Sequence, residues 1–436
     1  MDAKQIHKED ILGMVKDYHA VSFSPRGFVP GETYIPVSGK MLDACDLAAL
    51  VDASLDGWLT SGRFTSEFER DLARTLGVRF AALVNSGSSA NLLAISSLTS
   101  SQLGERALKP GDEVITLAAG FPTTVNPIIQ NNLVPVFVDT DESTLNVSID
   151  SLRRAISQKT KAIILPHTLG NPFNVRTVLE IAREHKLWLI EDSCDALGAQ
   201  YNGQLAGSFG DIATFSFYPA HHITTGEGGA IVTNDAVLNK IILSFRDWGR
   251  DCWCDTGKDN TCGKRFQWQL GDLPLGYDHK YIYSHIGYNL KATDMQAALG
   301  VSQLKKLAVF VERRRRNWQA LHDGLKSLEG RISFVCPTEY ASPSWFGFVV
   351  LINDPAIKRK GFIEYLESKK IGTRVVFGGN LTRQPAYKNV VFRQEGDLAN
   401  SDRAMRDAFW IGVYPGITDA MTDYMAETIK IYMSKI

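Results

Sequence analysis

Two short segments carry residue types that can bind a phosphorylated ring cofactor. The Ser/Gly-rich segment Asn85–Asn91 follows an apolar run and begins a helical pattern, so its backbone N–H groups can approach an anion. The same composition is also typical of an ordinary helix cap. Asp192 directly follows the apolar run Leu187–Glu191. A carboxylate there can pair with a protonated ring nitrogen of a pyridoxal-type cofactor, or it can cap a helix.

A third segment contains a candidate general base. Residues 216–229 read Ser-Phe-Tyr-Pro-Ala-His-His-Ile-Thr-Thr-Gly-Glu-Gly-Gly. The imidazole of His221 can accept a proton near neutral pH. Its neighbour His222 would point to the opposite side of extended backbone, so we assign it no chemistry.

Four cysteines could bind a metal: Cys194, Cys252, Cys254 and Cys262. They are separated by 57, one and seven residues. Four thiolates can hold Zn²⁺ or a [2Fe–2S] cluster, and this spacing is typical of neither a zinc finger nor a plant-type ferredoxin. The spacing by itself favours structural zinc or unrelated thiols. Cys45 and Cys336 have no partners in the pattern and are expected to be small buried hydrophobic side chains.

These segments lie in an alternating pattern of strands and helices. The expected strands are Phe80–Val84, Glu113–Leu117, Pro135–Asp139, Lys161–Pro166, Leu187–Glu191, Ile212–Phe217 and Gly229–Thr233. The expected helices are Ser89–Thr99, Pro122–Asn131, Ile149–Gln158 and Val175–Glu184. Several strands are apolar at consecutive positions, which is typical of strands buried on both faces. The pattern predicts an α/β fold with a mostly parallel sheet and polar ligand-binding loops at the carboxyl ends of its strands.

The 436 residues divide into three expected parts. Residues 1–40 form an N-terminal arm, and residues 41–300 a large cofactor-binding domain. That domain contains a Cys-rich insertion at about 245–285, which interrupts the strand–helix alternation. Residues 301–436 form a smaller α/β domain. One long helix from Asp294 to Leu328 is expected to mark the boundary.

Charge and hydropathy exclude several functional classes. The chain has 47 Lys and Arg against 48 Asp and Glu, a net charge of −1, so it has no electrostatic footprint for nucleic acid or an anionic membrane. The run Arg313–Arg316 is expected to be a solvated helix face. No apolar stretch reaches the roughly 18 residues of a membrane span, and Met1–Ala20 has no apolar core typical of a secretory signal. We therefore expect a cytoplasmic protein without nucleic-acid or membrane partners.

The segment around His221 resembles one in the sugar aminotransferases of the DegT/DnrJ/EryC1/StrS family, where it carries the Schiff-base lysine. Further resemblances to that family extend over about residues 40–430: Gly87-Ser88, Phe121 within Ala-Gly-Phe-Pro-Thr, His167–Gly170, and Gly287–Lys291 followed by Gln296-Ala297-Ala298. The resemblance implies an aspartate-aminotransferase-like fold, with a large domain and a smaller C-terminal α/β domain.

The chain departs from the family at the lysine. His221 replaces it, so the protein cannot attach the cofactor covalently there and the usual transaminase cycle is unavailable. One branch of the family, the sugar 3-dehydratases, has this replacement and uses pyridoxamine phosphate without covalent attachment. Asp195 and Tyr218 replace two frequent histidines, which suits that branch. The resemblance implies that His221 is the base and acid, and that Asp195 and Tyr218 position it.

The resemblance also assigns the cofactor contacts. Phe121 would stack on the pyridine ring and Asp192 would pair with its nitrogen. The phosphate would be held by Gly87, Ser88 and Ser216, with Asn289 donated by a second subunit, which implies a homodimer.

The cysteine set, combined with the lysine replacement, resembles an iron–sulfur branch of the 3-dehydratases. That resemblance implies a [2Fe–2S] cluster on Cys194, Cys252, Cys254 and Cys262, and a CDP-4-keto-6-deoxy-sugar substrate in dideoxysugar (O-antigen) biosynthesis. Electrons would come from an NADH-dependent flavin and iron–sulfur reductase. Three alternatives stay open: a cluster-free dehydratase that recycles the cofactor with glutamate, as with GDP-4-keto-6-deoxymannose; a zinc clip; and an inactive scaffold.

Overall fold

A mixed eight-stranded sheet forms the centre of the large domain. The computed structural model describes residues 3–23, 27–252, 254 and 257–436. In spatial order the strands are β1 (Phe80–Val84), β9 (Gly229–Thr233), β8 (Ile212–Ser216), β5 (Trp188–Asp192), β4 (Thr160–Pro166), β2 (Glu113–Leu117), β3 (Val134–Val138) and β14 (Arg393–Gln394). β9 runs antiparallel to both neighbours, and the remaining pairs are parallel. All seven expected strands are present, with ends shifted by one residue at most.

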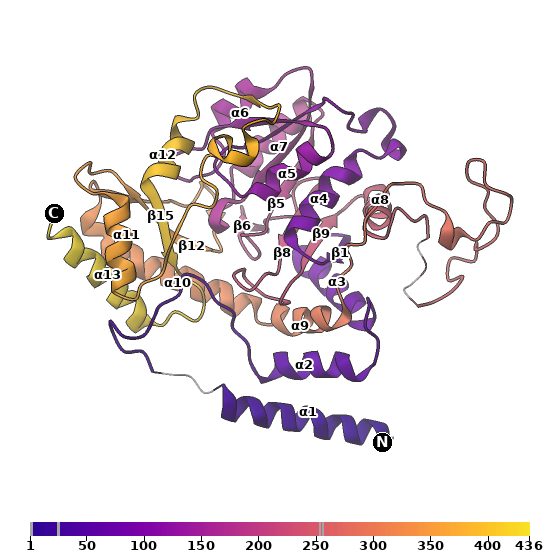
Figure 1. Ribbon diagram of the computed structural model, residues 1–436, viewed down its shortest axis with the longest axis horizontal. Helices are drawn as coiled ribbons and strands as arrows, with labels where there is room; N and C mark the ends of the chain where they lie inside the picture. Colours follow the sequence, from indigo (N-terminus) through magenta and orange to yellow (C-terminus); the bar gives the residue numbers. More distant parts are fainter. Residues whose placement is uncertain (1–2, 24–26, 253, 255–256) are drawn as a thin grey trace.

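Helices cover both faces of this sheet (Figure 1). One face packs against α4 (Gly87–Leu98), α5 (Pro122–Gln130) and α8 (Ala236–Arg246). The other packs against α3 (Arg63–Leu76), α6 (Ile149–Ala155), α7 (Val175–Glu184) and α9 (Asp294–Leu304). Burial on both faces explains why the central strands are apolar at consecutive positions. The expected α/β architecture is confirmed.

The expected single helix over Asp294–Leu328 is wrong, because the chain turns at Lys305–Lys306. It forms α9 and then α10 (Leu307–Leu325). Lys306 Nζ lies 2.6 Å from carboxylate oxygens of both Asp43 and Asp46, at the start of α2 (Ala44–Leu55). The turn lets α9 pack on α2 and α3, while α10 packs on α13 (Asp419–Met433) in the small domain.

The small domain contains an antiparallel sheet in the order β10 (Ile332–Phe334), β12 (Gly347–Ile352), β15 (Ala408–Gly412), β13 (Thr373–Val375). Helices α10, α11 (Arg359–Ser368), α12 (Ala399–Asp407) and α13 accompany it. Ile35 and Val37, from the expected N-terminal arm, lie in this domain's core. Conversely, β14 joins the large sheet. The two domains therefore exchange chain segments.

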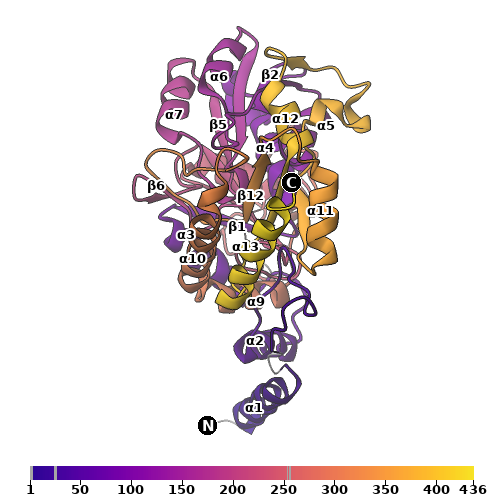
Figure 2. The same ribbon diagram turned by 90° about the vertical axis from the view of Figure 1, so that its left-hand side faces the viewer.

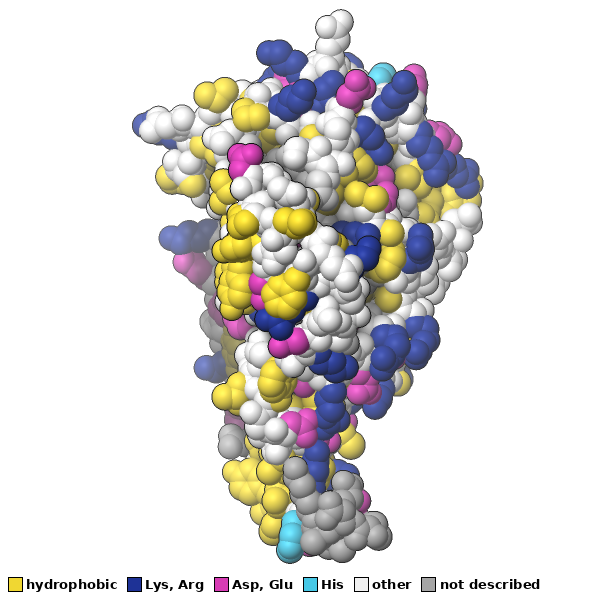
Figure 3. Space-filling model, turned by 90° about the vertical axis from the view of Figure 1, so that its right-hand side faces the viewer, with side chains coloured by type: hydrophobic (Ala, Val, Ile, Leu, Met, Phe, Trp, Pro, Cys, Tyr) yellow, Lys and Arg dark blue, Asp and Glu magenta, His cyan; other side chains and the backbone are white. Residues whose placement is uncertain are grey.

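Three smaller features complete the fold. α1 (Ala3–Ser22) lies beside α2 and projects from the body (Figures 1 and 2). A small sheet joins β11 (Ala341–Ser342), β6 (Gln200–Tyr201) and β7 (Gln204–Leu205). After α8 the insertion extends outward as irregular chain (Figure 1), and the face on its side of the molecule mixes hydrophobic and charged side chains (Figure 3). Within the described residues, no helix is both long and apolar enough to cross a membrane.

Candidate cofactor pocket and thiol group

A pocket of about 390 Å³ lies where β5 and β8 end and α4 begins. A cavity of this size fits a small-molecule cofactor. Nine of the residues singled out from the sequence line it: Gly87, Ser88, Phe121, Asp192, Cys194, Asp195, Ser216, Tyr218 and His221. The topology thus brings together segments that are more than 100 residues apart.

The amino end of α4 forms the anion-binding part of the pocket. The Oγ of Ser86 caps this helix by accepting from the N–H of Ser89 at 3.1 Å. A Cβ added to Gly87 would lie 2.5 Å from the Cβ of Ser216, so only glycine fits there. Backbone N–H groups at a helix start, with small side chains around them, leave room for a phosphate.

Asp192 is held rigidly at the carboxyl end of β5. Its Oδ2 accepts hydrogen bonds from Asn91 Nδ2 at 2.9 Å and from Thr124 Oγ1 at 2.6 Å, and its Oδ1 accepts from the N–H of Cys194 at 3.2 Å. No helix begins after Asp192, since residues 193–199 form turns, so the helix-cap alternative is excluded. Three donors aimed at one carboxylate fix its orientation, and its remaining lone pairs can accept a hydrogen bond from a protonated ring nitrogen.

Phe121 lies beside this carboxylate on the wall of the pocket. It is 52% exposed although it is a large aromatic residue, and its ring meets Phe377 of the small domain edge to face at 6.1 Å. A half-exposed ring on the pocket wall can stack on a flat cofactor ring.

His221 contacts Asp195 at the edge of the pocket. Its Nδ1 lies 3.4 Å from Oδ1 of Asp195, and the imidazole side chain is 15% exposed. Burial, together with the positive charge of Arg314, lowers the pKa of His221 to about 3. Burial and the nearby charge of Asp192 raise the pKa of Asp195 to about 8. The imidazole is therefore neutral at physiological pH and able to accept a proton.

Two neighbouring expectations have different outcomes. The Nε2 of His222 lies 2.7 Å from the carbonyl oxygen of Ser344, and the expectation that His222 takes no part in the chemistry stays a prediction. The expectation that Arg313–Arg316 form a solvated face is wrong for Arg314, which is 1% exposed. α10 packs between the domains, so one side of the arginine run faces protein.

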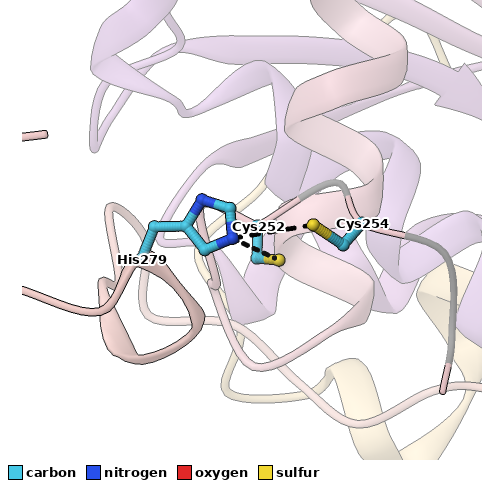
Figure 4. A group of neighbouring side chains, drawn as sticks. All are labelled: Cys252, Cys254 and His279. Carbon is cyan, nitrogen blue, oxygen red and sulfur yellow. Dashed lines mark hydrogen bonds between the residues drawn. The ribbon is translucent and has the colours of Figure 1, made fainter. Parts of the chain in front are cut away.

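Two of the four candidate metal ligands, Cys252 and Cys254, lie beside a histidine that the sequence analysis missed, His279 (Figure 4). A third, Cys262, also lies next to this imidazole ring. The Nε2 atom of His279 lies 3.3 Å from the Sγ of Cys252, 3.6 Å from that of Cys254 and 3.7 Å from that of Cys262. His279 is completely buried although it lies in the irregular insertion. The sequence could have indicated His279, because a histidine within a Cys-rich segment is a common metal ligand.

The loop around His279 is fixed by polar contacts. The N–H of His279 donates to the carbonyl oxygen of Arg265 at 3.0 Å, and the Arg265 side chain pairs with Asp278 at 2.7 Å. Lys280 pairs with Asp259 from another part of the insertion. These contacts hold the three sulfurs and the imidazole in one place.

Cys194 is not part of this group. It lines the cofactor pocket, and a Cβ added to Gly87 would lie 3.0 Å from its Sγ. Burial and the charge of Asp192 raise the pKa of its thiol well above the ordinary value. Its membership of the metal site stays a prediction. The expectation that Cys45 and Cys336 are buried is wrong, because both are exposed.

Asn289 lies outside the pocket of its own chain. Its side chain is exposed on the segment that follows the insertion, and its Oδ1 accepts a hydrogen bond from Lys291 Nζ at 2.9 Å. Its contribution to a second subunit stays a prediction.

The comparison with protein families decides the affiliation. The model of the DegT/DnrJ/EryC1/StrS aminotransferase family matches residues 41–430. The chain belongs to this family. The aminotransferase-like fold expected from the sequence is thereby confirmed.

Similar proteins include nucleotide-sugar 3-dehydratases. The "Lipopolysaccharide biosynthesis protein RfbH" of Salmonella typhimurium is 55% identical over 97% of both chains. The "dTDP-4-dehydro-2,6-dideoxy-D-glucose 3-dehydratase" of Saccharopolyspora spinosa is 54% identical over 98% of this chain and 92% of its own. A solved structure of GDP-4-keto-6-deoxymannose-3-dehydratase with a trapped PLP–glutamate geminal diamine has a TM-score of 0.81 and 31% identity, covering 91% of this chain and all of its own.

Proposed function

We propose that this chain uses pyridoxamine phosphate to remove the C3 hydroxyl of a nucleotide-linked 4-keto-6-deoxy sugar. One observation carries the proposal: an intact cofactor pocket contains a neutral imidazole, His221, at the position of the family's lysine. A residue that can accept a proton but cannot form a covalent bond to the cofactor suits dehydration rather than amino transfer.

The pocket residues fit the cofactor at each end. Gly87, Ser88 and Ser216 would hold its phosphate at the start of α4, and Asp192 would keep the ring nitrogen protonated. When bound, the cofactor supplies an amine for the C4 ketone of the sugar and a ring that takes up electrons. Phe121 covers one side of the ring position and helps to exclude water there.

His221 moves the protons of the reaction. It takes one from the methylene carbon of the cofactor and returns it to the oxygen that departs from C3. One residue would do both, since an imidazole that has accepted a proton as base can return it as acid. Asp195, whose Oδ1 lies 3.4 Å from Nδ1 of His221, and Tyr218, which is half-exposed on the pocket wall, would position the imidazole.

A comparison of two adjacent histidines tests this function. His221→Asn should lower both C3–O cleavage and solvent exchange of the cofactor methylene protons by about 10²-fold or more. The matched control, His222→Gln, should retain both. A His221→Asn protein that cleaves C3–O at the normal rate would contradict the proposal. The substrates to compare are CDP-, dTDP- and GDP-linked 4-keto-6-deoxy sugars. The similar proteins named above include dTDP- and GDP-sugar dehydratases, whereas the CDP-sugar is implied by the sequence resemblance.

Two routes can complete the turnover. The solved structure of the GDP-sugar dehydratase favours regeneration of the cofactor with glutamate, since it holds a trapped PLP–glutamate adduct. The group formed by Cys252, Cys254, Cys262 and His279 favours the second route, in which a [2Fe–2S] cluster passes electrons from an NADH-dependent reductase.

Spectroscopy and turnover together separate the two routes. Visible absorption that bleaches with dithionite, an S = 1/2 EPR signal and product formation only with a reductase would establish the cluster route. A featureless spectrum and turnover with glutamate alone would establish the other route, and zinc in the thiol group would then be a structural clip.

A further inference from the structure

Three phenylalanines form a continuous apolar wall of the cofactor pocket. The ring of Phe346 lies 5.3 Å from the imidazole of His221, measured between ring centroids. The ring of Phe377 follows at 6.3 Å from Phe346, and that of Phe121 at 6.1 Å from Phe377. All four residues line the pocket. The wall therefore runs in the order His221, Phe346, Phe377, Phe121, from the proposed base to the proposed stacking partner of the cofactor ring.

The small domain contributes apolar side chains to this pocket. Within the described residues, the two small-domain side chains that line it are Phe346 and Phe377. Both belong to the hydrophobic core of that domain, since Phe346 is buried in the core and Phe377 packs against it. A ligand hydroxyl placed against this wall would lose its hydrogen bonds to water without gaining one from either ring. The wall therefore favours an apolar part of a ligand.

The backbone of Phe377 is strained. Its φ is 46°, a left-handed conformation that is uncommon for a bulky side chain. Contacts with the large-domain loop that leads to Phe121 hold this conformation. The N–H of Gly378 donates to the carbonyl oxygen of Gly120 at 3.1 Å, and the N–H of Gly120 donates to that of Gly379 at 3.3 Å. Backbone strain that surrounding contacts maintain is typical of residues that act in binding, so Phe377 is a candidate for such a role.

Trp410 holds both small-domain rings in place. Its ring packs against that of Phe346 at 5.5 Å between centroids. Its Nε1–H donates to the carbonyl oxygen of Val375 at 3.1 Å, two residues before Phe377. Trp410 itself lies in the fully buried strand β15. The wall is therefore attached to a rigid element, as a surface that discriminates between similar ligands requires.

We propose that Phe377 is a specificity-determining residue that contacts the C6 methyl group of the sugar and discriminates against sugars with a hydroxyl at C6. The proposal rests on the proposed function, in which C4 of the sugar meets the cofactor amine and the C3 hydroxyl meets His221. C5, which carries the methyl group, is on the other side of C4 from C3. The methyl group is therefore directed along the wall, away from His221 and toward Phe377. It is the apolar substituent of a 4-keto-6-deoxy sugar, so it is the part that suits this wall.

The test compares pairs of nucleotide sugars that differ only at C6. One pair is dTDP-D-glucose, which has the hydroxyl, and dTDP-6-deoxy-D-glucose, which lacks it; the CDP- and GDP-linked pairs complete the set. These sugars have no ketone at C4, so they cannot react with the amine of the cofactor. Isothermal titration calorimetry of the protein loaded with pyridoxamine phosphate gives the ratio of the two Kd values. For the preferred nucleotide we expect the 6-deoxy sugar to bind about 10- to 100-fold more tightly, the usual discrimination of an apolar pocket against one added group.

Two substitutions separate the polarity of Phe377 from its contribution to the structure. Phe377→Leu keeps an apolar side chain and should keep most of the ratio, even where both sugars bind more weakly. Phe377→Asn introduces hydrogen-bonding groups and should abolish the preference, and Asn adopts a positive φ more readily than most residues. Tyr340→Asn is the matched control and should keep the wild-type ratio. Tyr340 is also an aromatic residue with a positive φ, 66°, but its exposed side chain is outside the pocket lining.

Equal weakening of both sugars in Phe377→Asn, with an unchanged Kd ratio, would overturn the proposal and leave Phe377 a purely structural role. A wild-type protein that binds the two members of each pair equally would also overturn it, whether or not either variant folds. These results differ from failure of the proposed function, in which His221→Asn retains C3–O cleavage, because the Kd ratio involves no bond cleavage.

Discussion

Asn91 Nδ2 donates to Oδ2 of Asp192 at 2.9 Å, although the two residues are 101 positions apart in the chain. Thr214 Oγ1 in turn donates to Oδ1 of Asn91 at 2.6 Å, which fixes the orientation of the amide. The carboxylate at the end of β5 is thus part of a buried network that links β5, β8 and α4. These hydrogen bonds hold the orientation of the Asp192 carboxylate.

This network should contribute to cofactor affinity. Thr124→Val removes the 2.6 Å hydrogen bond to Asp192 at nearly constant volume. We expect the Kd for pyridoxamine phosphate to rise about tenfold, since a hydrogen bond to a charged group contributes roughly 1.5–3 kcal/mol. Fluorescence titration measures it, and Thr99→Val, at the end of α4 and outside the pocket lining, is the control. An unchanged Kd would show that Asp192 needs no support from Thr124.

Gly87→Ala should close the phosphate end of the pocket. The added methyl group would lie 2.5 Å from Ser216 Cβ and 3.0 Å from Cys194 Sγ, so the start of α4 or the end of β8 must shift. We expect loss of cofactor binding with little change in helix content by circular dichroism. Ser88→Ala, whose side chain is exposed, should weaken binding only modestly. Normal binding by the Gly87→Ala protein would place the phosphate elsewhere.

Mixed subunits test the proposed role of Asn289. Asn289→Ala and Asp192→Asn homodimers should each be nearly inactive. If Asn289 serves the partner's pocket, a heterodimer of the two variants has one pocket with both defects and one intact pocket, and should recover up to half of the activity per dimer. No recovery on mixing would restrict Asn289 to its own subunit or remove it from the site.

Metal analysis identifies the fourth ligand of the thiol group. Cys254→Ser should lose the bound metal. The sulfurs of Cys252, Cys254 and Cys262 lie around the His279 ring, so we expect His279→Ala to lower the metal content. Cys194 lines the cofactor pocket instead, so we expect Cys194→Ser to retain the metal. The reverse pattern, with loss only in Cys194→Ser, would restore Cys194 to the ligand set and bring the insertion to the cofactor. Cys336→Ser, at an exposed thiol, is the control.

Acid should destabilise the fold through His221. The folded pKa of His221 is lowered to about 3, mainly by burial, so the native state excludes a proton that the unfolded chain binds below about pH 6.5. Stability from this group is therefore complete above pH 6.5 and declines as the pH falls. Between pH 6.5 and 5 the loss should be about 1–2 kcal/mol. Urea unfolding of the wild type and of His221→Asn, both without cofactor, measures this loss of stability. Asp195 is present in both proteins, so the difference between them excludes its opposite contribution. Equal losses of unfolding free energy in the two proteins would refute the prediction.

Local patterns in the sequence determined the central sheet and the pocket segments. The strands are apolar at consecutive positions because helices cover both faces, and that burial is visible in any single strand. Gly87 and Asp192 could be identified for a similar reason, since they lie within three residues of strand ends that the pattern fixes. His221 was identified instead from the resemblance of residues 216–229 to a family segment. The break at Lys305–Lys306 could not be identified, because the apolar repeat continues across it and only contacts with Asp43 and Asp46 mark the turn.

Only the tertiary structure showed which arginine is buried and which cysteines lie together. Arg314 stands in a run of four arginines that is typical of a solvated face, and only the packing of α10 between the domains buries it behind His221. His279 joins the thiols because the insertion folds back on itself, and Cys194 is separated from them because β5 ends inside the pocket. Such long-range contacts depend on the path of the whole chain, whereas a sequence pattern records only the environment of its own segment.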